Sequence, residues 1–392
     1  LIQNSLDARS PNTTGPVLVS IRQVTAEPSL MESIFGDEFM GRLQAAEGKC
    51  PEPNLRRYLV IEDFGTTGLN GVWDDQDNQE DGQHWNAFWF REGEGSKQGK
   101  GANGSAGQGK ITFYRMSGVR SLIGYTVRES DGAGLLMGRS HFSRDYVNGG
   151  KRYHRHSFWT INNKNPRPLQ DGRELNMWRD RLGLKRTREP GLSLVIPFSE
   201  AINKEAILLP LAGEFYFAIK KKRLAFSLNG AEVTHETIDK LANGIEDKDL
   251  LRERSAFTST MRRFTNQMMA IPDEKIIPVK ADWNNESNLK ATCFGKSQFE
   301  SLESDFASGK ILAVRFPVIV SHKANGRIAS HFDVFLQSEE GMAASEEAFI
   351  RRDLVIGLEK HLGKGGYLQR ARAITLIRDE ELSAFLSDAE EP

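Results

Sequence analysis

The stretch "RRYLVIEDFGTTGLNG", residues 56–71, constrains the fold more than any other part of the chain. Its first half, Arg56–Asp63, contains the apolar run Tyr58–Ile61, which is typical of a buried strand. The strand ends on a carboxylate, and glycines follow at Gly65 and Gly68. Glycine adopts turn conformations that other residues avoid and lets a ligand come close to the main chain. The stretch therefore predicts a buried strand that delivers Asp63 to an accessible, glycine-rich turn.

The rest of the chain shows both helical and strand patterns. Alternating or continuous apolar runs predict strands at Gly15–Val24, Leu192–Phe198, Arg223–Leu228, Lys310–Ser321 and Ser330–Gln337. Apolar residues at helical spacing predict helices over Leu1–Ala8, Pro28–Lys49 and Ala206–Ile219, from Ile111 onward, and at Glu381–Leu386. The segment Asp74–Gly109 is polar, rich in glycine and expected to be a loop. A mixture of this kind predicts an α+β protein.

Length and composition suggest two ordinary globular domains. The chain has 392 residues, 39% of them hydrophobic and 27% charged, and a change of pattern near Phe198 divides it into 1–197 and 198–392. No apolar run approaches the roughly 18 residues of a membrane span, and no signal peptide is visible. Two cysteines make neither a disulfide framework nor a zinc site. The cytoplasm is the expected location.

Two stretches before the glycine-rich segment predict binding chemistry. In "NSLDA", Asn4 and Asp7 lie about one helical turn apart, and an inward amide oxygen can ligate a hard cation such as Mg²⁺. Asp63, at its strand end, can accept a hydrogen bond from an exocyclic amine such as that of adenine. Gly65 and Gly68 would let the main chain approach the base. A metal ligand and a base-reading carboxylate together predict a nucleotide site.

A third stretch, "GSAGQGK", predicts a phosphate-binding loop. Gly104, Gly107 and Gly109 free main-chain N–H groups to surround phosphate oxygens, and a predicted helix follows from Ile111. Lys110 would place a positive charge on a terminal phosphate. The pattern is not a Walker A motif, because no Ser or Thr follows the lysine.

In this order, the three stretches resemble the GHKL ATPase superfamily, which includes gyrase, the large heat-shock chaperones, histidine kinases and MutL. "IEDFGTTGLNG" and "GQGK" are also similar to a set of uncharacterised bacterial stand-alone ATP-binding proteins. The resemblance covers about half the chain, Leu1–Phe198. It implies a Bergerat-type two-layer sandwich, with a mixed sheet covered by helices on one face, followed by a second α+β domain.

The resemblance also implies residue roles. Asn4 would bind Mg²⁺, with Asp7 beside it; Asp63 would read adenine; Gly65 and Gly68 would shape the base pocket. The phosphate lid would consist of Gly104, Gly107, Gly109 and Lys110. The chain departs from the family pattern twice. One extra residue separates Gly65 from Gly68, and Leu192 occupies the position of the family's threonine. Ser193, one residue later, is the candidate hydroxyl at the adenine site, although a shift of one residue turns a strand side chain to the other face.

The implied function is an ATP-binding, Mg²⁺-dependent, ATP-hydrolysing conformational switch that dimerises on binding ATP. The family's catalytic base is a Glu four residues before the Asn, which places it just before Leu1, outside the sequence given. Residues 198–392 would act as a transducer that contacts a protein partner. A nucleic-acid-remodelling module of the MutL or MORC type remains an alternative, because Arg115–Pro190 carries 16 Lys and Arg against 7 Asp and Glu; nucleic-acid contact is not the favoured reading. Phosphotransfer of the histidine-kinase type is the other alternative.

Overall fold

A computed structural model describes residues 1–389. It leaves out 53–55, 76–79, 81, 92–107, 161–164, 171, 247–257, 286–288, 290, 323–325, 343 and 357–369. The described chain divides into two compact units. The first comprises residues up to 203 together with 224–232, and the second comprises 204–223 and the residues from 233 onward.

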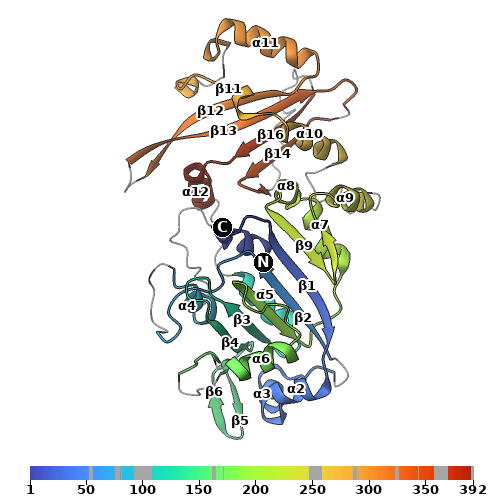
Figure 1. The fold of residues 1–392 in the computed structure, drawn as a ribbon, viewed down its shortest axis with the longest axis vertical. Coiled ribbons are helices and arrows are strands. Elements are labelled where there is room, and N and C mark those ends of the chain that lie inside the picture. Colours follow the sequence, from blue (N-terminus) through green and yellow to red (C-terminus); the bar gives the residue numbers. More distant parts are fainter. Residues whose placement is uncertain are drawn as a thin grey trace. The chain divides into compact units, whose positions relative to one another are not determined.

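The first unit contains an eight-stranded mixed sheet (Figure 1). In spatial order its strands are β10 (Ala231–Val233), β9 (Leu224–Leu228), β1 (Val17–Thr25), β2 (Arg57–Phe64), β8 (Gly191–Pro197), β3 (Ser121–Val127), β4 (Gly134–His141) and β7 (His156–Trp159). A separate hairpin joins β5 (Tyr146–Asn148) to β6 (Lys151–Tyr153). β9 pairs with β1 in parallel, although it lies beyond residue 198 in the sequence. The sheet thus takes strands from both sides of the predicted domain boundary.

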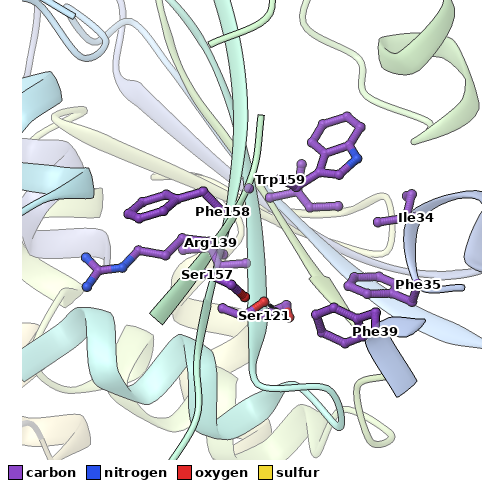
Figure 2. A pocket seen from close by; sticks show the side chains of 12 residues that line it. Ile34, Phe35, Phe39, Ser121, Arg139, Ser157, Phe158 and Trp159 are labelled. Carbon is purple, nitrogen blue, oxygen red and sulfur yellow. Dashed lines mark hydrogen bonds between the residues drawn. The ribbon is translucent and has the colours of Figure 1, made fainter. Parts of the chain in front are cut away.

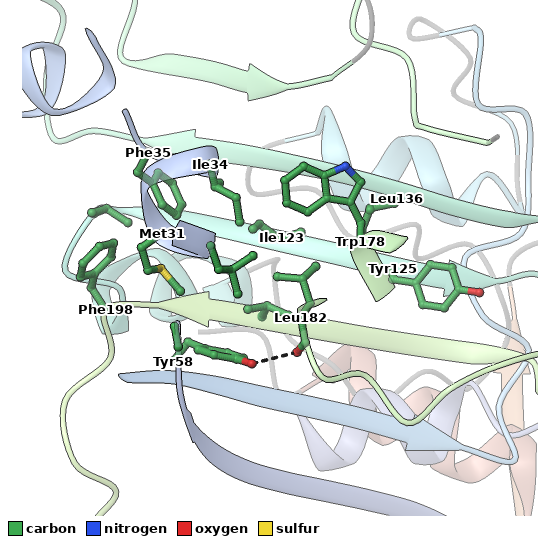
Figure 3. Packing of buried hydrophobic residues seen from close by; sticks show 14 of the residues in the cluster. Met31, Ile34, Phe35, Tyr58, Ile123, Tyr125, Leu136, Trp178, Leu182 and Phe198 are labelled. Atoms are coloured by element: carbon green, nitrogen blue, oxygen red, sulfur yellow. Dashed lines mark hydrogen bonds between the residues drawn. The ribbon is translucent and has the colours of Figure 1, made fainter. Parts of the chain in front are cut away.

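One face of this sheet packs against three helices. They are α2 (Pro28–Ile34), α3 (Asp37–Glu47) and α6 (Gly172–Arg181). Figure 3 shows Met31, Ile34 and Phe35 of this layer packed over strand residues such as Tyr58 and Ile123. The Tyr58 hydroxyl also donates to the Leu182 carbonyl at 3.2 Å, just after α6 (Figure 3). Burial of this apolar layer is the main stabilising contribution on this side.

The opposite face carries three further helices, α1 (Ile2–Asp7), α4 (His84–Trp89) and α5 (Gln108–Met116). Trp85 and Trp89 of α4 pack on Leu135 and Met137 of β4. Leu136, between these two strand residues, points to the other face and packs on the α6 side. Gly124 leaves the room that the Trp89 ring occupies, because a Cβ there would lie 2.8 Å from that ring. The predicted arrangement, with helices on one face, did not include this second set. Helix α4 falls in the stretch expected to be a loop.

The second unit contains a six-stranded sheet. In spatial order its strands are β11 (Ile277–Pro278), β12 (Leu312–His322), β13 (Gly326–Ser338), β16 (Ala371–Ile377), β14 (Glu346–Arg351) and β15 (Leu354–Ile356). Its helices are α7 (Lys204–Ala212), α8 (Tyr216–Lys220), α9 (Ile238–Glu246), α10 (Ser259–Met269), α11 (Lys296–Ala307) and α12 (Glu380–Ala389), with single 3₁₀ turns at Asp273–Lys275, Trp283–Asn285 and Ala291–Cys293. Parallel and antiparallel pairs both occur. The α+β prediction, with a large mixed sheet and a second sheet, is confirmed.

Candidate functional site

The carboxylate of Asp63 lies where β2 ends, with both oxygens held. Oδ1 accepts hydrogen bonds from the Thr66 hydroxyl at 2.7 Å and from the Leu192 main-chain N–H at 2.8 Å. Oδ2 accepts one from the Ser5 hydroxyl of α1 at 3.0 Å. The side chain is 12% exposed. The strand, the turn after it, the first helix and the start of β8 thus meet at one acceptor group.

The turn after β2 is joined to the end of α1. Gly65 and Gly68 have φ of +77° and +69°, in the left-handed region that favours glycine. The Thr67 N–H donates to the Ala8 carbonyl at 2.9 Å, and the Ser10 N–H donates to the Gly65 carbonyl at 2.9 Å. These two main-chain bonds fix α1 beside Asp63. The extra residue between the glycines is therefore accommodated in a turn that contacts the helix.

Asn4 and Asp7 are both exposed on α1, whereas Ser5 is buried and contacts Asp63. The inward position on this helix thus belongs to Ser5, and Asn4 lies one residue away from it. Sequence reasoning expected the Asn4 amide to face inward. The pattern "NSLDA" alone did not reveal which side of so short a helix would meet the sheet.

Ser193 is fully buried on the face of the sheet that also carries Glu62. Its hydroxyl donates to Glu62 Oε1 at 3.0 Å and accepts a hydrogen bond from Arg186 Nε at 3.0 Å. The Asp63 carboxylate is instead held by the main-chain N–H of Leu192. The one-residue offset noted in the sequence therefore has its expected consequence, because alternate strand residues face opposite sides. Ser193, the candidate hydroxyl at the adenine site, therefore contacts Glu62 and Arg186 and not the Asp63 carboxylate.

The Lys110 ammonium group caps the end of α4. Nζ donates to the carbonyls of Ala87 at 2.7 Å, Phe88 at 3.3 Å and Arg91 at 2.5 Å. A cation at a helix C-terminus interacts favourably with the unpaired carbonyls there. Gly109 falls within α5, and Gly104 and Gly107 lie outside the described residues. A phosphate contact by Lys110 would require its ammonium group to leave these carbonyls.

Sequence reasoning missed Arg186 and Glu62, whose side chains are both 0% exposed. Glu62 accepts hydrogen bonds from Arg22 at 2.7 Å and from the main-chain N–H groups of Lys185 and Arg186, each at 3.1 Å. Burial lowers the pKa of the Arg186 guanidinium, and the carboxylates of Asp63 and Glu62 act in the opposite direction. In "LKRTREPG" Arg186 lies among three other charged residues, Lys185, Arg188 and Glu189. The sequence gives no reason to select Arg186 from among them.

The turn that carries Arg186 toward β8 is closed by Glu189. Its exposed carboxylate accepts hydrogen bonds from the main-chain N–H of Thr187, from that of Arg188 and from the Thr187 hydroxyl, each at 3.0 Å. The backbone hydrogen bond from Thr187 is the largest of several that lower the pKa of Glu189 to about 2.

We expect the Glu189 carboxyl carbon to titrate near pH 2 in an NMR experiment, with Glu189→Gln used to assign its resonance. Because the folded pKa lies below the unfolded value, near 4.3, the stabilisation by Glu189 is complete above that value. It is lost as the pH falls through about 2. The difference in unfolding free energy between wild type and Glu189→Gln should therefore vanish in strong acid. A midpoint near 4.3 would show that the turn does not hold this carboxylate.

Several arginines of the basic stretch Arg115–Pro190 have local acceptors. Its described ion pairs include Arg120 with Glu47, Arg128 with Asp131, and Arg179 with Asp180. Arg139 donates to the Trp89 carbonyl. Such pairs favour a surface of ordinary ion pairs over a nucleic-acid-binding patch.

A cavity of about 90 Å³ lies in another part of the first unit (Figure 2). Its floor is a row of three serines, Ser121, Ser140 and Ser157, which face one another across β3, β4 and β7. Phe35 and Phe39 form an apolar wall on the α2 and α3 side (Figure 2). No residue of the sequence-predicted site lines this cavity, so it is separate from the Asp63 site.

In the ranges that the structure covers, no three His, Cys, Asp or Glu side chains gather into a group that could hold a metal ion. Among the helices described there, none is both long and apolar enough to cross a membrane.

No protein-family description matches the sequence, and no curated protein sequence matches it. Solved structures that match include the ATPase region of Saccharomyces cerevisiae topoisomerase II bound to ICRF-187 (dexrazoxane), with TM-score 0.36 and 10% identity over 96% of this chain and 71% of that chain. The ATPase domain of Aquifex aeolicus MutL matches with TM-score 0.21 and 8% identity, over 96% of this chain and 86% of that chain. Both are ATPase domains, but similarity this low establishes neither family nor activity.

Proposed function

We propose that this chain binds ATP at the end of β2, between α1 and the start of β8, and acts as a Mg²⁺-dependent ATPase of the GHKL type. The observation that carries the proposal is the held carboxylate of Asp63. An ionised carboxylate offers about two acceptor positions on each oxygen. Within the described residues Oδ2 accepts one hydrogen bond, from Ser5, which leaves a position for the amino group of adenine.

The exposed Asn4 fits the proposed metal role. Mg²⁺ keeps several waters and is usually bound by one or two protein oxygens together with substrate phosphates. The absence of a three-residue cluster in the described chain is compatible with such a site. Asn4 is next to Ser5, which contacts Asp63, so one helix would serve both ends of the nucleotide. When bound, Mg²⁺ would neutralise charge on the phosphates.

The remaining parts of the proposal follow the sequence resemblance. Gly104, Gly107, Gly109 and Lys110 would close over the phosphates, and Asp7 would line the same side as Asn4. We assign the catalytic base to no residue of this chain. The proposed output is a change of conformation, passed to a second copy or to a protein partner through the second unit.

Calorimetric titration of the full chain with ATP and MgCl₂ tests the proposal. We expect saturable binding with a dissociation constant between about 1 μM and 1 mM, the range usual for enzyme substrates. Asn4→Ala should weaken binding about tenfold in MgCl₂ and leave binding in EDTA unchanged, because only the metal-dependent part involves Asn4. Gln3→Ala, a change at a half-buried neighbour on the same helix, is the matched control. Absence of binding at millimolar ATP would refute the proposal.

A further inference from the structure

We propose that Arg186 is a positioning residue for Asp63 and thereby determines selectivity for a purine that carries a 6-amino group. The proposal rests on the function proposed above. It concerns a buried cation that lies outside the sequence motifs and does not touch the expected ligand.

The guanidinium of Arg186 lies where β2 and β8 separate. The last residue pair between these strands is Glu62 with Ser193. Beyond that pair Nη2 donates to the main-chain carbonyl of Asp63 and, at 3.0 Å, to that of Leu192. One nitrogen thus joins the two strands where their own ladder has ended.

This contact sets the geometry of the Asp63 carboxylate. The residue whose carbonyl Nη2 holds, Leu192, also donates its N–H to Asp63 Oδ1. Nη2 itself lies 3.6 Å from Oδ1, within ion-pair distance. The guanidinium also lies over the Phe64 ring, 4.7 Å from its centroid, where a cation–π contact is favourable. Loss of Arg186 would leave the main-chain carbonyls of Asp63 and Leu192 without this donor. It would also remove the nearest described cation from the Asp63 carboxylate.

Only arginine can make this set of bonds. Nη1 donates to the carbonyls of Glu189 and Pro190, both at 2.8 Å, and Nε donates to Ser193 Oγ. Together with Nη2, all three nitrogens are engaged with acceptors in fixed directions, which suits a planar fork of five N–H groups. A buried cation is tolerated only when it is paired and hydrogen-bonded. Lysine would supply the charge but could not span these acceptors.

The test compares ATP with purine riboside triphosphate, which lacks the 6-amino group, by calorimetry on the full chain with MgCl₂. Wild type should prefer ATP by about 10- to 100-fold, the usual effect of a hydrogen bond to a charged group. Arg186→Met should reduce that preference to less than about threefold while leaving the analogue's affinity almost unchanged. Arg22→Met is the matched control, because Arg22 also binds Glu62 but its described bonds go to Glu62 and the Gly183 carbonyl. It should keep the full preference.

The outcomes separate the two proposals. If wild type binds neither nucleotide, the proposed function fails and the role of Arg186 fails with it. If wild type prefers ATP and Arg186→Met keeps that preference, only the role of Arg186 is refuted. An equal loss of affinity for both nucleotides would show a purely structural role and also refute it. Should Arg186→Met not fold, Arg186→Lys replaces it in the same comparison, and an undiminished preference for ATP in that variant overturns the proposal.

Discussion

Replacing Asp63 with Asn is expected to weaken ATP binding by about 100-fold. The carboxylate faces three described donors, the Thr66 hydroxyl, the Leu192 N–H and the Ser5 hydroxyl. An amide has one acceptor oxygen, so its NH₂ group must face some of these donors or the adenine amine. A lost hydrogen bond to a charged group costs about 1.5–3 kcal/mol, and about 1.4 kcal/mol corresponds to a tenfold change in affinity.

Calorimetry and a thermal unfolding curve, recorded on the same variant, distinguish lost binding from lost folding. Asp145→Asn is the matched control, because Asp145 is an exposed aspartate beside the β5–β6 hairpin that accepts the Arg155 N–H at 2.9 Å. It should bind ATP like wild type. If Asp63→Asn also binds ATP like wild type, the adenine-reading carboxylate has been misplaced and the nucleotide proposal loses its main support.

The strand that delivers Asp63 could be predicted from the sequence because its signal is local. Tyr58–Ile61 is continuously apolar and is followed by two carboxylates and, at Gly65, a glycine. The structure has β2 over Arg57–Phe64. The strand expected at Leu192–Phe198 is likewise confirmed as β8, Gly191–Pro197. Buried strands of this kind can be recognised from their composition, whichever strands they pair with in the fold.

The helices over Pro28–Lys49 and in the expected loop Asp74–Gly109 were less predictable. The first separates into α2 and α3 at Phe35 and Gly36, a break that apolar periodicity does not mark. Helix α4 has six residues, too few for a periodic signal, and it is held by burial of Trp85 and Trp89 against the sheet. Helices this short depend on tertiary packing more than on intrinsic propensity.

The candidate site likewise contains residues that local sequence could predict and residues that it could not. The sequence predicted Asp63 at a strand end with Gly65 and Gly68 in the turn after it, and the structure has them there. Ser193, which the sequence offered as a nucleotide contact, is instead buried against Glu62 on the other face of the sheet. Contacts between distant segments could not be predicted, because no local sequence pattern indicates them. Arg186 approaches Asp63 across 123 residues, and Ser5 approaches it across 58. In the sequence, neither Arg186 nor Ser5 differs from other polar residues. Only the fold brings them next to Asp63.

Replacing Gly68 with Ala is expected to have the largest effect on stability, because two costs combine at this position. Gly68 has φ of +69°, where an L-residue costs about 1–2 kcal/mol. An added Cβ would also overlap the Val127 carbonyl oxygen and lie 2.8 Å from Thr126 Oγ1 and 3.1 Å from the Gly191 carbonyl. Overpacking of this kind costs about 1–3 kcal/mol more. The combined loss of about 3 kcal/mol should appear as a lower urea midpoint with an unchanged slope.

Gly132→Ala isolates the steric part of that loss. Gly132 has φ of +70°, almost the same as Gly68, but an added Cβ would meet no atom within 4 Å. It should therefore lose only the conformational term, about 1–2 kcal/mol, and keep ATP binding. The two glycines thus have nearly the same φ but different surroundings. Gly68 is crowded because Thr126 accepts the Leu69 N–H at 2.9 Å and donates to the Gly191 carbonyl at 2.8 Å, which draws the turn onto β3 and β8. Equal losses in the two variants would mean that this turn is not packed against those strands, and that Asp63 is not held in the way the proposed site requires.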